Sequence, residues 1–238
     1  MPSYQVKLAG REQLAEGTLA FRFEKPAGFN FKAGQAVVLE LLEPPPGEGQ
    51  KRRTFSLVSA PFESALVIAT RMRDTAFKRA LKTLPDGASM KLTGPIGQFK
   101  LAEAARPAVF IAGGIGITPF MSMLRQAARD RSPQKLLLLY SNRRPEDAAF
   151  LGELQELERQ NSNFRLFATM TDMDKSSRKW DGETGLVEAD LIKRCVGGLV
   201  APVYYVVGPP AMVVAMQETL HGAGVAEDDI RSEEFYGY

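Results

Sequence analysis

The chain has 238 residues, of which 45% are hydrophobic and 24% are charged, and its formal net charge is +2. These values are typical of a globular protein that is long enough for two ordinary domains, and without a basic block they do not support nucleic-acid binding. One cysteine, Cys195, and one histidine, His221, exclude a disulfide framework, a zinc site built on cysteine pairs and an iron–sulfur cluster held by this chain alone. We therefore expect no metal, and we expect an organic cofactor or carboxylates and hydroxyls to carry any chemistry.

The N-terminal residues contain no apolar core of a signal peptide, and no apolar run of about 18 residues occurs anywhere in the sequence. We therefore expect a cytoplasmic protein that binds neither membrane nor nucleic acid.

Residues 1–100 consist mainly of short segments in which apolar and polar residues alternate, which is typical of half-buried strands. A proline- and glycine-rich stretch at 43–51 predicts a surface loop, and helical spacing of apolar residues predicts a helix over 75–84. Six such strands with one helix predict a small antiparallel β-barrel. The expected strands are 4–8, 18–23, 36–42, 53–59, 65–71 and 89–93.

The rest of the chain alternates buried strands with helices, which predicts a parallel sheet covered on both faces. The expected strands are 109–112, 135–140, 164–170 and 203–207, and the expected helices are 119–129, 145–160, 188–194 and 210–221. We therefore predict two domains. Residues 1–102 form an antiparallel six-stranded β-barrel, and residues 103–238 form a doubly wound α/β domain.

A glycine-rich turn follows the apolar run at 108–112. Gly113, Gly114 and Gly116 permit a sharp turn, Thr118 suits a helix N-cap and Pro119 suits the first helical position. A strand, a glycine turn and a helix start aim backbone N–H groups at an anion or a carbonyl. Close packing of a helix is the alternative reason for such a turn.

A second turn of this kind, Gly208-Pro-Pro-Ala-Met212, follows the strand 203–207. If both strands are central and parallel, the two turns lie close together at the carboxyl edge of the sheet, where ligands bind.

Arg53-Thr-Phe-Ser56 lies on a predicted strand of the barrel. A guanidinium, a flat ring and a hydroxyl suit a ligand with a phosphate and an aromatic system, although an ordinary edge strand is the alternative. Asp74 or Thr75 would cap the helix 75–84 and leave backbone N–H groups free for a second phosphate contact.

Four motifs in this order resemble the ferredoxin–NADP reductase family over essentially the whole chain. They are Arg-x-aromatic-Ser at 53–56, Gly-Pro-x-Gly-x-Phe at 94–99, Gly-Gly-x-Gly-x-Thr-Pro at 113–119 and Gly-Pro-Pro-x-Met at 208–212, followed by an aromatic tail. The resemblance implies a flavin-binding barrel followed by a nicotinamide-nucleotide domain, with FAD and NADPH or NADH as cofactors.

The resemblance also implies roles for individual residues. Arg53 would hold the flavin pyrophosphate, Phe55 would pack on the isoalloxazine ring and Ser56 would bond near flavin N5. The implied FAD-binding residues are Arg53, Thr54, Phe55, Ser56, Thr70, Asp74, Thr75, Ala76, Phe77, Thr118, Phe235 and Tyr238. The implied nicotinamide-nucleotide residues are Gly113, Gly114, Gly116, Pro119, Ser141, Arg143, Arg144, Gly208, Pro209 and Met212. The implied catalytic residues are Ser56, Thr118 and Glu233.

Three features depart from the family pattern. Phe55 stands where tyrosine is usual, and Val207 stands where many members have cysteine. Glu233 and Phe235 fit the usual spacing of the aromatic tail, but three residues follow, so Tyr236 or Tyr238 is an alternative stacking ring. We expect the terminal aromatic residue to act as a gate that leaves the flavin when a nicotinamide binds.

The implied reaction moves a hydride between NAD(P)H and FAD and passes single electrons to a separate ferredoxin, flavodoxin or other one-electron acceptor. Arg143, Arg144, Arg178 and Lys179 favour NADPH, unless they form only a solvated loop. The alternatives are the reductase component of an oxygenase system, a non-catalytic flavin subunit of a larger electron-transfer complex, and a nucleotide-binding module without flavin.

Overall fold

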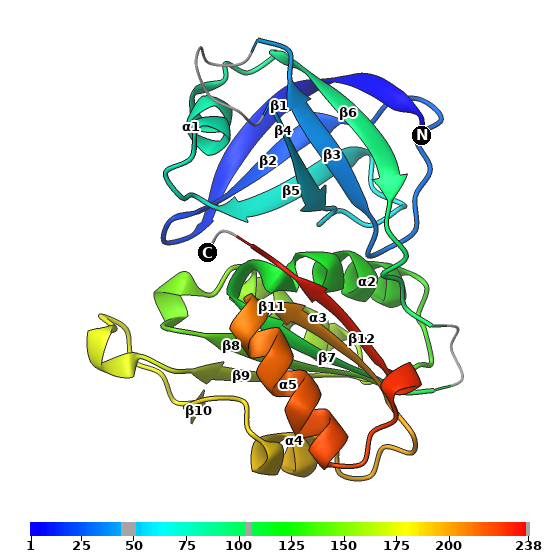
Figure 1. Cartoon of the computed structure of the whole chain (residues 1–238), viewed down its shortest axis with the longest axis vertical. Helices are drawn as coiled ribbons and strands as arrows, with labels where there is room; N and C mark the ends of the chain where they lie inside the picture. Colours follow the sequence, from blue (N-terminus) through cyan, green and yellow to red (C-terminus); the bar gives the residue numbers. More distant parts are fainter. Residues whose placement is uncertain (44–50, 103–105, 237–238) are drawn as a thin grey trace. The chain divides into compact units, whose positions relative to one another are not determined.

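The computed structural model describes residues 1–43, 51–102 and 106–236, and they form two compact units (Figure 1). The first unit comprises Met1–Lys100 and Thr118–Gln126, and the second comprises Leu101–Ile117 and Ala127–Tyr238. Residues 103–105 and most of the predicted loop 43–51 lie outside the described range, so the domain limits 1–102 and 103–238 stay a prediction.

The first unit is built on a six-stranded antiparallel sheet in the order β4-β3-β6-β1-β2-β5. A bridge between Leu57 and Ile68 joins the residue after β4 to β5, and the Val58 N–H donates to the Val67 carbonyl at 2.8 Å. Because β4 and β5 are the two edges of the sheet, these contacts close it into the predicted barrel. The elements are β1 (Ser3–Ala15), β2 (Thr18–Glu24), β3 (Ala36–Leu41), β4 (Arg52–Ser56), β5 (Ala65–Arg71), α1 (Ala76–Thr83) and β6 (Ser89–Ile96).

Alternation along the strands supplies the core of the barrel. Phe21 and Phe23 on β2 and Leu39 on β3 are fully buried, and α1 adds Phe77 and Leu81 to the same cluster. Burial of a large apolar side chain contributes about 1.5–3 kcal/mol, so these strands and α1 stabilise one another.

The second unit contains a fully parallel sheet in the order β10-β9-β8-β7-β11-β12. Every residue of β7 and β11 is buried, as expected of strands covered on both faces. Val109 and Ile111 of β7 pack with residues of α4 and α5. The strands are β7 (Ala108–Gly113), β8 (Leu136–Asn142), β9 (Phe164–Met170), β10 (Glu183–Thr184), β11 (Val203–Gly208) and β12 (Ile230–Glu234), and the helices are α2 (Thr118–Arg129), α3 (Leu151–Gln160), α4 (Ala189–Val196) and α5 (Pro210–Gly222).

The first part of α2 contacts the barrel. The Ser122 hydroxyl donates to the Ser59 carbonyl at 2.7 Å, and Arg125 forms a 3.4 Å ion pair with Glu63. This part of α2 therefore belongs to the first unit, although the sequence places it in the α/β domain.

Several details differ from the sequence-based expectation. The 3₁₀ helix Gly114–Ile117 runs directly into α2, so the prediction that Thr118 is an N-cap is wrong: the helical turns begin before it. Phe150 adopts a left-handed conformation (φ 62°) and separates the 3₁₀ turn Pro145–Asp147 from α3, so the expected helix 145–160 is interrupted. The edge strands β10 and β12 were not predicted, because neither is long enough or apolar enough to produce a clear alternating pattern.

No helix in the described part of the chain is both long and apolar enough to span a membrane.

Candidate functional site

A cluster of cationic side chains lies at the N-terminal end of α1. The Nε atom of Arg53 is buried and has no hydrogen-bond partner among the described residues. The Lys78 ammonium donates to the Arg71 carbonyl at 2.7 Å. Burial, together with the nearby charges of Arg53 and Arg73, lowers the pKa of Lys78 to about 8. Burial is the largest cause of this shift, and the repulsion from Arg53 and Arg73 adds to it. A bound anion would offset that repulsion, so the cluster suits an anionic ligand.

Asp74, the acid that follows Arg73 in the sequence, does not neutralise this cluster. Asp74 forms an ion pair with Arg79, whereas the Arg53 Nε remains unpartnered among the described side chains.

The start of α1 adds backbone donors. Thr75 is the N-cap, and its hydroxyl accepts from the Lys78 N–H at 3.3 Å, which confirms Thr75 rather than Asp74 as the cap. The first N–H groups of a helix have no partner within it, so those of Ala76 and Phe77 are available to a phosphate. Arg53, Lys78 and this helix end together fit a pyrophosphate.

The other residues predicted for the flavin occupy different environments in the barrel. Phe55 is 9% exposed and its ring lies 5.9 Å from that of Phe77, so most of its surface already packs in the core. Ser56 and Thr70 are buried, and Thr54 is exposed. Thr70 donates to the Arg71 carbonyl at 3.3 Å. Their predicted contacts with a flavin stay predictions.

The two glycine turns meet in the second unit, as the sequence predicts. β7 and β11 are parallel neighbours, with Ala112 opposite Val207. A Cβ atom on Gly116 would overlap the Val207 carbonyl, and one on Gly113 would overlap the Met212 sulfur and lie 3.0 Å from Pro209 Cδ. Both glycines are therefore required for the close approach of the turns, in addition to any contact with a ligand.

Thr118 and Pro119, at the start of α2, are both buried, and Thr118 is 1% exposed. The aromatic ring that follows them, Phe120, lies 5.9 Å from Phe99. The predicted catalytic role of Thr118 stays a prediction.

Polar residues follow the carboxyl end of β8. Ser141 is half-buried and Arg143 is exposed. Arg144 makes a bidentate ion pair with Asp147, through contacts of 2.9 and 3.1 Å. Between Ser141 and Arg143 lies Asn142, whose side-chain nitrogen and oxygen are both buried without a partner in the described structure.

The C-terminal segment forms the edge strand β12. Glu233 pairs with Val207 of β11, and burial raises the pKa of the Glu233 carboxyl. The Phe235 N–H donates to the Gly208 carbonyl at 2.9 Å, so the backbone is held to the sheet as far as Phe235. Tyr236 is 78% exposed and its hydroxyl bonds the Glu234 carboxylate. Tyr238 lies outside the described residues.

Sequence reasoning missed two residues, Lys78 and Asn142, whose environments in the structure are unusual. Lys78 could have been found, because it lies three residues after the cap Thr75 and this spacing places both residues at one helix end. Asn142 could not, because the burial of its unpartnered carboxamide depends on how the sheet assembles. Among the described residues, no group of three or more His, Cys, Asp and Glu residues is arranged to hold a metal ion.

Comparison with known proteins relates the whole chain to flavin- and nicotinamide-dependent reductases. Residues 110–218 match the family model of the oxidoreductase NAD-binding domain. Ferredoxin–NADP reductase B of Sorangium cellulosum is 31% identical, and the alignment covers 98% of this chain and 97% of that protein. The toluate 1,2-dioxygenase electron transfer component of Pseudomonas putida is 30% identical over 98% of this chain and 67% of its own length.

Solved structures share the fold. The ferredoxin NADP⁺ reductase of Neisseria gonorrhoeae, with bound FAD and NADP, superposes with a TM-score of 0.81 at 22% identity, covering 98% of each chain.

Proposed function

We propose that this chain, which belongs to the ferredoxin–NADP reductase family, oxidises NAD(P)H through bound FAD and passes single electrons to a separate carrier of ferredoxin or flavodoxin type. The coarser statement, that it is an NAD(P)H–flavin oxidoreductase, follows from its similarity to ferredoxin–NADP reductase B over nearly the full length of both proteins. The carrier, and a cytoplasmic location, belong to the proposal.

The observation that carries the proposal is the cation cluster at α1. Arg53 offers a buried Nε without a partner in the described structure, and Lys78 has a pKa of about 8 because it is buried near Arg53 and Arg73. The pyrophosphate of FAD supplies the negative charge that this cluster lacks. FMN, with one phosphate, would use less of the cluster, so the geometry favours FAD.

The remaining predicted residues receive these proposed roles. Ser56, Thr118 and Glu233 serve the reaction itself, and Phe55 offers its exposed edge to the flavin ring. The proposed FAD contacts are Arg53, Thr54, Phe55, Ser56, Thr70, Asp74, Thr75, Ala76, Phe77, Thr118, Phe235 and Tyr238. The proposed contacts with the nicotinamide nucleotide are Gly113, Gly114, Gly116, Pro119, Ser141, Arg143, Arg144, Gly208, Pro209 and Met212.

When bound, FAD supplies the exchange between two-electron and one-electron transfer, and the protein supplies binding and alignment. Arg53 and the α1 N–H groups hold the phosphates. The meeting of the glycine turns at Gly113 and Gly208 shapes the carboxyl edge of the sheet, where a nucleotide binds. Burial at Glu233 keeps its proton to a higher pH than in an exposed glutamate.

The acceptor is proposed to be a separate protein because the 238 residues contain one cysteine, too few for an iron–sulfur cluster. A second candidate is the reductase component of an oxygenase system. It is favoured by the similarity to the toluate 1,2-dioxygenase component and to the propane 2-monooxygenase reductase component of Rhodococcus jostii, which is 30% identical.

One anaerobic experiment tests the proposal. The purified protein, loaded with FAD, is mixed with NADPH or NADH, and flavin absorbance is followed before candidate carriers are added. We expect bleaching by at least one nicotinamide and reoxidation by a one-electron carrier. A protein that does not bind FAD, or whose bound flavin is reduced by neither nicotinamide, would contradict the proposal. Mass analysis of the released cofactor distinguishes FAD from FMN.

A further inference from the structure

The turns that follow β8 and β9 are joined at one edge of the parallel sheet. Asn142 and Met170, the last residues of these strands, are directly paired. Beyond them, the Thr171 N–H donates to the Asn142 carbonyl at 2.9 Å, and the Asp172 N–H donates to the Arg143 carbonyl at 2.8 Å. The side chains of the two turns therefore share one surface, beyond the end of the second strand of the unit.

This surface contains almost equal numbers of cations and acids. The cations of residues 143–147 and 171–179 are Arg143, Arg144, Lys175, Arg178 and Lys179, and the acids are Glu146, Asp147, Asp172 and Asp174. Several are already paired with one another. Asp147, whose side chain is 3% exposed, holds Arg144, and both carboxylate oxygens of Asp172 accept from the Lys175 ammonium, at 2.9 and 3.1 Å.

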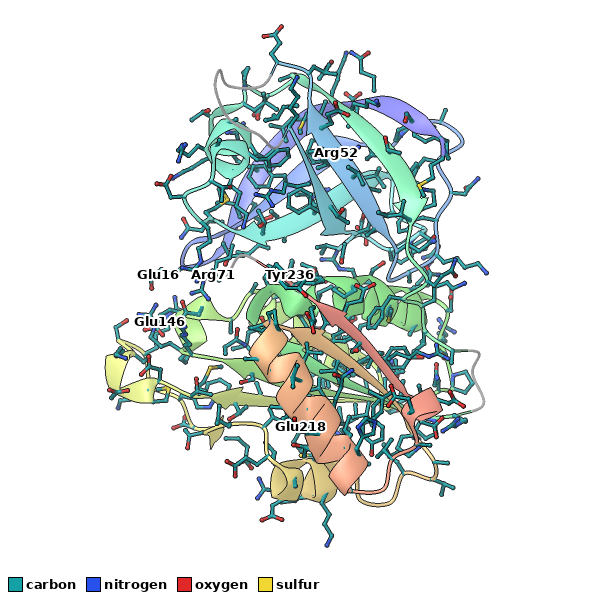
Figure 2. All side chains as sticks on the ribbon, viewed as in Figure 1. Glu16, Arg52, Arg71, Glu146, Glu218 and Tyr236 are labelled. Atoms are coloured by element: carbon teal, nitrogen blue, oxygen red, sulfur yellow. The ribbon has the colours of Figure 1, made fainter. Side chains whose placement is uncertain are left out.

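The turn after β9 also contains a set of donors typical of a phosphate site, and Glu146 occupies it. The Ser177 N–H and hydroxyl donate to one oxygen of the Glu146 carboxylate at 2.7 and 2.8 Å. The Ser176 hydroxyl lies 2.9 and 3.1 Å from its two oxygens. Figure 2 shows Glu146 on the turn after β8, beside the turn after β9.

The titration of Glu146 agrees with this geometry. Desolvation would raise the pKa of the carboxyl, but bonds from its own N–H and from Ser176 and Ser177 outweigh it and lower the pKa to about 2. The side chain is therefore an anion throughout the physiological range, and it competes for these donors with any phosphate.

We propose that this edge of the sheet receives the adenosine end of a nicotinamide dinucleotide without a 2′-phosphate, and that Glu146 excludes the 2′-phosphate, so that NADH is the preferred reductant. The inference rests on the proposed function, since it names the form of its substrate. An acid near the end of the second strand suits a free ribose hydroxyl, whereas a 2′-phosphate needs a cation that is available to it.

A 2′-phosphate could take one of two positions at this edge, and carboxylates repel it in both. It could displace Glu146 from Ser176 and Ser177, or it could lie beside the acids of the two turns, and each position brings negative charges together. The cation cluster at α1 is the useful contrast within the same chain, because there a buried arginine nitrogen has no partner among the described residues. Here Arg144 and Lys175 are held by carboxylates, and the remaining cations of the two turns, Arg143, Arg178 and Lys179, share the surface with four acids. The sequence-based preference for NADPH counted the cations Arg143, Arg144, Arg178 and Lys179 without their partners. The structure shows that one of them, Arg144, is paired with Asp147.

The test compares kcat/KM for NADH and NADPH in the FAD-loaded protein and its Glu146→Gln variant. We expect the wild type to favour NADH by at least about tenfold, and the ratio of kcat/KM for NADPH to kcat/KM for NADH to rise about tenfold in the variant. Gln keeps the size of the side chain and an acceptor oxygen, and removes the charge. Glu218→Gln on the exposed face of α5 removes the same charge elsewhere and is the matched control.

Calorimetric binding of 2′-AMP and 5′-AMP gives a readout that does not depend on turnover. We expect the wild type to bind 5′-AMP more tightly, and Glu146→Gln to gain affinity for 2′-AMP. A wild type that prefers NADPH or 2′-AMP, or a Glu146→Gln variant whose ratios match those of Glu218→Gln, would overturn the inference. If neither nicotinamide reduces the flavin, the proposed function fails, and the wild-type AMP titrations still decide the inference.

Discussion

Arg53 keeps a buried Nε without a hydrogen-bond acceptor in the described structure, and an unpaired buried donor costs about 1–3 kcal/mol. Lys78 lies in the same cluster and its pKa is lowered by burial and by the charges of Arg53 and Arg73. The Arg53 Nε therefore lacks an acceptor among the described residues, and the charged form of Lys78 is disfavoured although its ammonium donates to the Arg71 carbonyl. We infer that FAD compensates for this cost when it binds.

Replacement of Arg53 by methionine is expected to separate binding from stability. FAD affinity should fall by about tenfold or more, because a charge-assisted bond to phosphate contributes about 1.5–3 kcal/mol. The melting temperature of the FAD-free protein should stay the same or rise. Fluorescence titration with FAD and thermal melts measure the two effects. Arg22→Met, on an exposed position of β2, is the control, and equal losses of FAD affinity in both variants would contradict the assignment.

Lys78 predicts a pH dependence of FAD binding. Its pKa falls from 10.5 to about 8 on folding, so the unfolded state binds more protons between these values, and this residue's contribution to the stability of the FAD-free protein grows as pH rises through that window. A bound pyrophosphate favours the charged lysine instead. Binding should then take up a proton, and the FAD dissociation constant should rise as pH passes about 8, by at most about tenfold per pH unit.

Titrations of FAD affinity from about pH 7 to about pH 9 check this expectation. A lysine with an ordinary pKa stays charged over that range and would produce no change in affinity. The Lys78→Arg variant should bind tightly with little pH dependence, and Lys78→Met should bind weakly with little pH dependence. A pH profile in Lys78→Met that matches the wild type would show that another group is responsible.

At the scale of elements, the contact between the turns after β7 and β11 depends on the absence of side chains. A Cβ on Gly116 meets the backbone of Val207, which cannot rotate away as a flexible side chain can. Thr118 begins α2 directly after this turn, so a shift here would also move the start of that helix.

Gly116→Ala should therefore destabilise the protein by about 1–3 kcal/mol, the usual cost of overpacking. Gly152 offers a matched control, because it lies in α3 and a Cβ there meets nothing within 4 Å. Gly152→Ala should stabilise the protein by up to about 0.5–1 kcal/mol. Urea unfolding of both variants measures the difference, and a neutral Gly116→Ala would mean that the turns separate without cost.

At the scale of the whole molecule, each unit has a hydrophobic core of its own, one inside the barrel and one against the parallel sheet. A ligand stabilises the unit that binds it by about 2.7 kcal/mol at a hundred times its dissociation constant. The two cofactors should therefore protect different elements from hydrogen exchange.

We expect FAD to slow amide exchange in β4 and α1, and NAD⁺ to slow it at the ends of β7, β8 and β11. Hydrogen exchange followed by mass spectrometry, with each ligand added alone, measures this pattern. Protection by FAD that is confined to the second unit would contradict the placement of the pyrophosphate at Arg53.

A comparison of individual elements shows which parts of the fold could be predicted from the sequence. Regular alternation in β2 and β3 and continuous apolar runs in β7 and β11 identified the barrel and the parallel sheet, because burial on one face or on both produces these patterns directly. Thr75 was recognised as a possible cap from its residue type. The edge strand β12 was missed, since Ile230–Glu234 contains one apolar residue and its pairing with β11 is a long-range contact.

The sequence by itself determined the two architectures and the order of the motifs, because local periodicity and glycine positions are properties of short segments. Only the tertiary structure decided which charges are matched. It leaves the Nε of Arg53 without a partner among the described residues and places Lys78 near that guanidinium, while it brings Ser176 and Ser177 onto Glu146 across thirty residues or more. Ion pairs and buried donors depend on distances between segments far apart in the chain, and those distances exist only after the sheet has assembled.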